Sequence, residues 1–113
     1  MRDTLANRQR SAPPGAGYWC ECLAHTPDHA RTFWLGSAPA GSPAPALRWL
    51  LARARDVAEQ LDPAYALPVR HWLGDEGEHR RILTALARGE LYSFTAADDT
   101  ARYVLSARPG AAW

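Results

Sequence analysis

The residue types that could do chemistry gather in the ten residues from Cys20 to His29. Thiolate sulfur and imidazole nitrogen are the ligands that tetrahedral Zn²⁺ takes in proteins, so a strand followed by a loop could bring Cys20, Cys22, His25 and His29 onto one ion. The spacing argues against this, because zinc-binding cysteines are usually separated by about two to four residues. We therefore expect no metal, with Cys20 and Cys22 as buried core thiols, and we keep a small zinc-binding domain as an alternative.

The sequence carries none of the catalytic motifs that a linear pattern can reveal. It has no Gly-x-Ser-x-Gly nucleophile motif and no glycine-rich phosphate loop. His71 and His79 lack a recognisable nucleophile, so they are better explained as hydrogen-bonded structural residues. Asp75, Glu76 and Glu78 suit the start of a helix, where carboxylates meet the positive end of the helix dipole. The sequence therefore favours a protein that is not an enzyme and has no catalytic residue and no cofactor.

Tryptophan is unusually frequent, with five in 113 residues. Alternation along the predicted strands places Trp19 and Trp34 on the solvent face of a sheet, and the helical pattern places Trp49 almost opposite an apolar stripe. Exposed indoles are costly in water and are enriched at protein interfaces. Stacked arginines, or a terminal segment folded across the sheet, could also cover these rings. We take Trp19, Trp34, Trp49 and Arg53 as the candidate partner-binding residues.

Two hypotheses about function follow from these aromatic residues. The first is a small interaction domain that acts as a homodimer or as an accessory subunit through the outer face of the sheet. The second is single-stranded nucleic-acid binding, in which Trp19 and Trp34 stack on bases while Arg2, Arg8 and Arg10 contact phosphates. The order of elements is not that of an RNA-recognition motif. We therefore place a protein partner or self-association first and nucleic acid second.

The composition is that of an ordinary globular chain. The residues are 47% hydrophobic and 22% charged, and a net charge of +1 gives little general attraction for nucleic acid. All thirteen basic residues are arginine, which we attribute to a high-GC bacterial genome. No window approaches the roughly 20 apolar residues of a membrane-spanning helix, and the N-terminus lacks the apolar core of a signal peptide. We expect a cytoplasmic protein without membrane contact, in which both cysteines stay reduced.

The first predicted hairpin joins strands at about residues 17–24 and 31–35, and a linker over 37–41 follows it. The second strand should bury two side chains and expose the one between them, because side chains alternate along a strand. The inward residues are Phe33 and Leu35, and the outward residue is Trp34.

The longest predicted helix covers about residues 42–61. Its apolar residues recur at three- and four-residue steps, which gathers them on one face; they are Leu47, Leu50, Leu51, Ala54, Val57, Ala58 and Leu61. Ser42 is expected to cap this helix, and Pro43 is expected to occupy its first turn, where a missing N–H costs nothing.

Two shorter helical segments are predicted after it. One starts after Asp62 and is expected to break at Pro68, since an interior proline loses a backbone hydrogen bond and clashes with the preceding turn. The other runs from Asp75 to Arg88, with Asp75 as its cap and Gly89 as its stop.

The chain is expected to end in a second hairpin, with strands at about 91–95 and 102–106. The simplest closure is an α+β fold, in which two β-hairpins form a four-stranded antiparallel sheet and a helical middle of about three helices packs on one face. The predicted organisation is a flexible basic tail over 1–16, a single domain over 17–108 and a short tail over 109–113.

Overall fold

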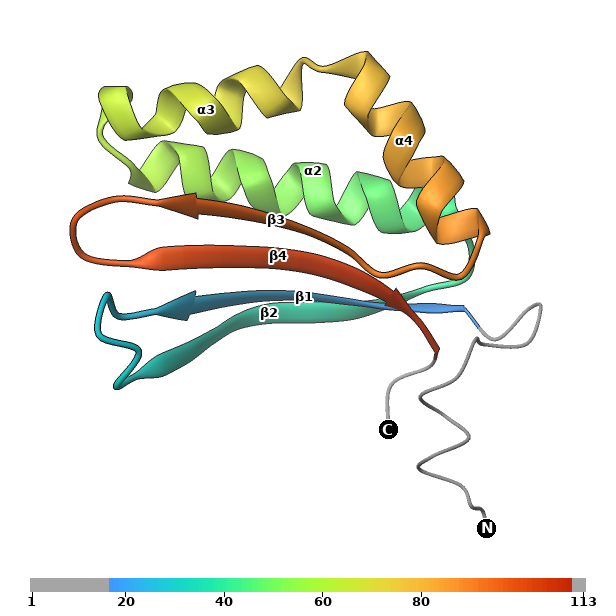
Figure 1. The fold of residues 1–113 in the computed structure, drawn as a ribbon, viewed down its shortest axis with the longest axis horizontal. Helices are drawn as coiled ribbons and strands as arrows, with labels where there is room; N and C mark the ends of the chain where they lie inside the picture. The colour runs from blue at the N-terminus through green and yellow to red at the C-terminus, as the bar shows by residue number, and fades with distance from the viewer. Residues whose placement is uncertain (1–16, 111–113) are drawn as a thin grey trace, which may run out of the picture.

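The computed structural model describes residues 17–110. Within this range it is the predicted α+β fold, with three helices on one face of a four-stranded antiparallel sheet (Figure 1). The elements are β1 (Tyr18–His25), β2 (Thr32–Ala40), α2 (Pro43–Gln60), α3 (Pro63–Leu73), α4 (Glu76–Ala87), β3 (Tyr92–Ala97) and β4 (Arg102–Pro109). The predicted N-terminal tail, 1–16, and the last residues, 111–113, lie outside the described residues.

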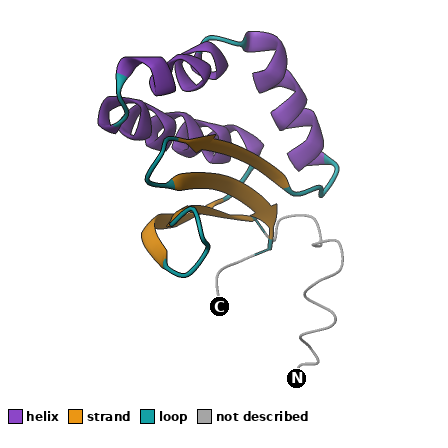
Figure 2. Cartoon of the chain, turned by 60° about the vertical axis from the view of Figure 1, so that its left-hand side comes forward, coloured by secondary structure: helices purple, strands orange, loops and turns teal. Residues whose placement is uncertain are grey.

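The sheet order is β2-β1-β4-β3, so each hairpin contributes one edge strand and one central strand. β1 pairs with β4 along its whole length and joins the two hairpins into one sheet. The inward side chains of β1 include Cys20 and Cys22, which are buried under the helices. Trp19 and Glu21 alternate with them on the outer face, over which no helix of residues 17–110 lies (Figure 2).

α2 is the helix around which the core forms. Its apolar stripe packs on β1 and β4, and Leu50 and Ala54 are completely buried there. Pro43 occupies the first turn as predicted. Ser42 stands at the N-cap position with extended backbone, but its side chain makes no capping hydrogen bond. The predicted side-chain cap is therefore wrong, and this helix is stabilised mainly by its packing.

α3 is one helix from Pro63 to Leu73, so the predicted break at Pro68 is wrong. An interior proline removes the hydrogen bond to the carbonyl four residues earlier, which here belongs to Ala64. Pro68 and Ala64 are both exposed, so water can bond that carbonyl. The helix continues because its opposite face is held in the core through Ala66, Val69 and Trp72.

α4 starts and stops where the sequence predicts. The Asp75 carboxylate accepts a hydrogen bond from the backbone N–H of Glu78 at 3.0 Å, which satisfies one free amide of the first turn. Ile82 and Leu86 are completely buried. Gly89 follows with a φ of +81°, a left-handed conformation that glycine adopts without strain.

The strands extend beyond their predicted ends. β2 includes residues 37–40, which were expected to form a linker but pair with the first half of β1. Pro39 is compatible with this pairing, because prolines are tolerated in edge strands. β4 likewise continues to Pro109 instead of ending near Ser106. Among residues 17–110, no helix is both long and apolar enough to cross a membrane.

Candidate surface for association

Three large apolar residues are exposed in a row on the edge strand β2. Phe33 is 46% exposed, Trp34 59% and Leu35 47%, and we call these three residues the edge patch. Trp34 lies opposite Leu23 on the outer face of the sheet, which confirms its predicted direction. Phe33 lies opposite the buried Ala24 and therefore on the helix side. The prediction that Phe33 and Leu35 are core residues is nevertheless wrong, because no part of residues 17–110 covers them fully.

A β-bulge bends β2 at the edge patch. Cys22 pairs with Gly36, whereas the next residue, Leu23, pairs with Trp34. Leu35 is therefore an extra residue without a partner on β1, and such an insertion bends and twists the strand. Leu35 shares a groove with the inward-facing Cys22, so it lies on the helix side of the sheet. The edge patch thus presents two apolar side chains on the helix side and one on the outer side.

The positions of the helices explain why the edge patch is uncovered. α2 packs on β1, on β4 and, less extensively, on β2, whereas α3 packs on β3 and α4 packs on β3 and β4. β2 therefore lies at the edge of the sheet that α3 and α4 do not cover (Figure 1). Trp49 of α2 does reach β2, since a Cβ on Gly36 would lie 3.8 Å from its ring. Trp49 is therefore half-buried against the sheet, and its predicted position opposite the apolar stripe is wrong. Residues 36–38 and Ala40 are half covered, whereas residues 32–35 and Pro39 are exposed.

Leu35 forms one wall of a groove of about 340 Å³ between β2 and α2. The lining residues come from three strands and one helix: Cys22, Leu35, Arg53, Asp56, Val57, Gln60 and Tyr103. Arg53 pairs with Asp56 at 2.9 Å, and its guanidinium lies 5.7 Å from the centroid of the Trp49 ring. Its Nε is buried without a hydrogen-bond partner among the described residues. The groove therefore joins an apolar wall to a charged rim directly beside the edge patch.

Trp19 also lies on the outer face, but it is held by its neighbours. Its indole N–H donates a hydrogen bond to the Glu21 carboxylate at 2.8 Å. Glu21 also forms an ion pair with Arg108 at 3.5 Å. Trp19 is half-buried, in contrast to Trp34, which is mostly exposed. The free aromatic surface is therefore concentrated at β2.

The four zinc candidates do not form one site. Cys20 and Cys22 are buried on the helix side of β1, whereas His25 lies on the outer face with its Nδ1 2.9 Å from the Thr32 hydroxyl. The His29 ring is 6.1 Å from that of His25. Within residues 17–110, no group of three or more His, Cys, Asp or Glu residues is placed to hold a metal ion. Burial raises the pKa of Cys20 to about 11 and also raises the pKa of Cys22, so both are protonated thiols at neutral pH.

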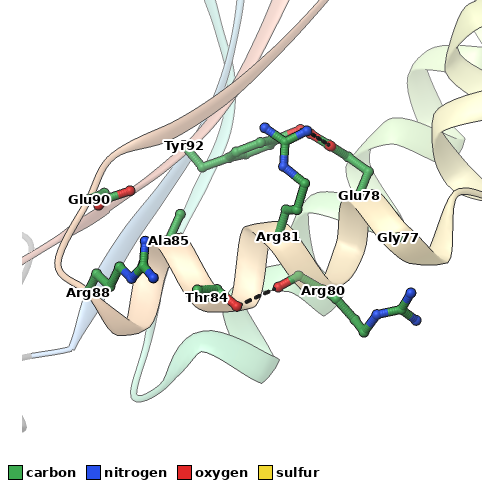
Figure 3. Close-up of a pocket in the computed structure, with 9 residues that line it drawn as sticks. All are labelled: Gly77, Glu78, Arg80, Arg81, Thr84, Ala85, Arg88, Glu90 and Tyr92. Carbon is green, nitrogen blue, oxygen red and sulfur yellow. Dashed lines mark hydrogen bonds and ion pairs between the residues drawn. The ribbon is translucent and has the colours of Figure 1, made fainter.

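A second hollow, of about 560 Å³, lies between α4 and the start of β3 (Figure 3). Its lining is mostly charged: Gly77, Glu78, Arg80, Arg81, Thr84, Ala85, Arg88, Glu90 and Tyr92. Arg81 pairs with Glu78 at 3.2 Å. The Tyr92 hydroxyl donates to Glu78 at 3.0 Å and accepts from the Trp72 indole at 2.9 Å. Burial raises the pKa of Tyr92 to about 12, so the neutral phenol serves to tie α3, α4 and β3 together.

Comparison with protein-family models, curated proteins and solved structures found no match for this chain. The assignment of a functional surface therefore rests on geometry. Of the predicted partner-binding residues, Trp34 belongs to the edge patch, Arg53 lines the groove beside it, and Trp49 contacts Arg53. Trp19 lies on the neighbouring strand.

Sequence reasoning missed Phe33 and Leu35 as surface residues. Alternation along β2 indicates to which side a side chain points, but it does not indicate whether a helix covers that side. The signal that could have found them is the run of three large apolar residues in one strand. A half-buried strand would normally place a polar residue at the middle position of such a run.

Proposed function

We propose that this protein is a non-enzymatic interaction domain that forms a homodimer through the edge patch. The observation that carries the proposal is the exposure of Phe33, Trp34 and Leu35 side by side on an edge strand. All nine residues of β2 are uncharged. Monomeric sheet proteins commonly protect an open edge with charged side chains, and grouped apolar exposure is typical of binding surfaces. The proposal keeps the cytoplasmic location expected from the sequence, where two free thiols are common.

The proposal moves the interface from the outer face of the sheet, where the sequence placed it, to the β2 edge. Trp19 is engaged by Glu21, so it offers less free surface than Trp34 does. The arginines of the nucleic-acid hypothesis, Arg2, Arg8 and Arg10, lie outside the described residues. Nucleic-acid binding therefore stays a prediction, which we rank second.

Sedimentation velocity of the full chain over a range of micromolar concentrations tests the proposal. The wild-type protein should sediment as a dimer at the upper end of the range. Trp34→Lys should weaken dimerisation by about tenfold or more, because it places a charge in the middle of the apolar interface. The matched control is Leu67→Lys, which removes an apolar side chain of similar exposure from α3 (67%, against 59% for Trp34) and should leave the dimer unchanged.

Two results would contradict the proposal. A wild-type protein that remains a monomer throughout the range would exclude a homodimer of useful affinity. An equal loss of association in Trp34→Lys and Leu67→Lys would show that general apolar exposure, and not the edge patch, drives the contact. Circular dichroism of both variants establishes that each one is folded before its association is compared.

A further inference from the structure

The three side chains of the edge patch are divided between the two faces of the sheet. Phe33 and Leu35 lie on the helix side, and Trp34 lies on the outer side. A partner that packed flat against either face would cover one of these sets and leave the other in water. A strand added alongside β2 would cover both, because its own side chains alternate between the two faces.

The position of β2 in the sheet allows such an addition. β1 is its one neighbour within residues 17–110, so the backbone groups on the other side of β2 have no strand partner among these residues. The bulge at Leu35, the last residue of the edge patch, and the missing N–H of Pro39 limit regular pairing from Leu35 onward. A partner strand can therefore pair only over a short length, at the start of β2 around Phe33 and Trp34.

The strand that fits this edge is β2 of a second copy. The added strand must carry large apolar side chains directed to both faces, and β2 has this pattern and no charge to repel its copy. Residues 1–16 contain only Met1 and Leu5 as large apolar residues, so that segment matches poorly.

We infer that two copies pair their β2 strands antiparallel around a two-fold axis at Trp34, which gives one continuous eight-stranded sheet. This inference rests on the proposed function and specifies its geometry. Directly opposite residues share a face of the sheet, so Trp34 meets Trp34 on the outer side and Phe33 meets Leu35 on the helix side. An axis at Phe33 would instead place Arg31 against Leu35. The axis at Trp34 is thus the one that pairs all three apolar residues with one another.

Disulfide trapping tests this register. Phe33→Cys and Leu35→Cys are prepared as two full-length proteins, mixed and exposed to a mild oxidant, and the products are identified by intact mass. Directly opposite residues have Cα atoms about 4.5–5.5 Å apart, within the range of a disulfide. The mixture should therefore form the mixed disulfide dimer in a yield roughly fivefold or more above that of either protein alone. The mixed dimer keeps the Trp34 contact and one Phe33–Leu35 contact.

The single variants are built-in controls. With the axis at Trp34, two Phe33→Cys residues lie two positions out of register, or about 7 Å along the strands, which puts them beyond disulfide reach. The same is true of two Leu35→Cys residues. The wild-type protein shows whether the native Cys20 and Cys22 form disulfides themselves. We expect none, because their side chains are only 0% and 2% exposed.

The outcomes separate the register from the proposed function. Efficient trapping of Phe33→Cys alone would place the axis at Phe33 and overturn the inferred register. A dimer in sedimentation that yields no trapped product in any combination would keep the homodimer but overturn strand pairing. A monomer in sedimentation would overturn both. Hydrogen exchange gives a second test that needs no added cysteine. Those amides of residues 33–35 that point away from β1 should exchange more slowly at concentrations where the dimer forms, whereas amides of the other edge strand, β3, should not change.

Discussion

In β3, Tyr92 and Phe94 point to the helix side of the sheet, as Phe33 and Leu35 do in β2. Phe94 stacks on Trp72 with ring centroids 4.5 Å apart, whereas Phe33 and Leu35 remain nearly half exposed. The difference lies in the helices, since α3 and α4 pack on β3 while α2 leaves the start of β2 open. The two edges teach that the same strand pattern can become core or interface, depending on an element far away in the sequence.

The largest expected effect comes from removing the corresponding aromatic ring at each edge. Phe94→Ala should lower the free energy of unfolding by about 3 kcal/mol, because it removes apolar burial and the stack on Trp72. Phe33→Ala should cost about 1 kcal/mol or less in the monomer, as expected for an exposed residue. Urea denaturation measures both values, at a protein concentration too low for the dimer to form. An equal loss of stability in the two variants would mean that Phe33 is as well covered as Phe94, which would contradict the difference between the two edges.

A second prediction concerns the first hairpin, in which the inward side chains of β1 are buried and the start of β2 is exposed. It is tested by the pH dependence of stability. Burial raises the pKa of Cys20 from its ordinary value of 9.0 to about 11. Because the pKa is raised in the folded state, the protonated thiol contributes fully to stability below about pH 9, and this contribution is lost as the pH rises through about 11. Between about pH 9 and pH 11, the free energy of unfolding should therefore fall by on the order of 2 kcal/mol more in the wild-type protein than in Cys20→Ala.

Urea denaturation of both proteins at several alkaline pH values measures the difference. The tyrosines with raised pKa values, Tyr65, Tyr92 and Tyr103, are present in both proteins, so their effects on stability cancel in the comparison. Parallel stability curves for the two proteins would show that Cys20 ionises without cost and would contradict its burial in the core.

The smallest expected effects concern the starts of the helices beside each edge. Asp75→Ala should cost about 1 kcal/mol, because it removes the hydrogen bond to the Glu78 N–H at the start of α4. Ser42→Ala should cost only a few tenths of a kcal/mol, roughly the loss from a surface residue, because Ser42 makes no capping bond to α2. Thermal or urea denaturation measures both variants. A larger loss for Ser42→Ala would show that α2 depends on its cap as much as α4 does.

Local physical chemistry made much of the fold predictable. Alternation in β1 placed Cys20 and Cys22 inward, and the apolar steps along α2 gathered Leu50 and Ala54 on its buried face. The Asp75 cap likewise follows from residues close in sequence. These features depend on side-chain direction and short-range hydrogen bonds, which the sequence determines within a few residues.

Coverage was decided only by the tertiary structure. Pro68 stays helical because the other face of α3 is held in the core, and Trp49 is half-buried because α2 passes near Gly36. Phe33 and Leu35 point to the side that alternation predicts, yet they are exposed because the helices leave the start of β2 uncovered. The sequence by itself therefore determined which way these side chains point. Burial depends on contacts between elements far apart in the chain, and so the packing of the helices alone decided which apolar residues became core and which remained available to a partner.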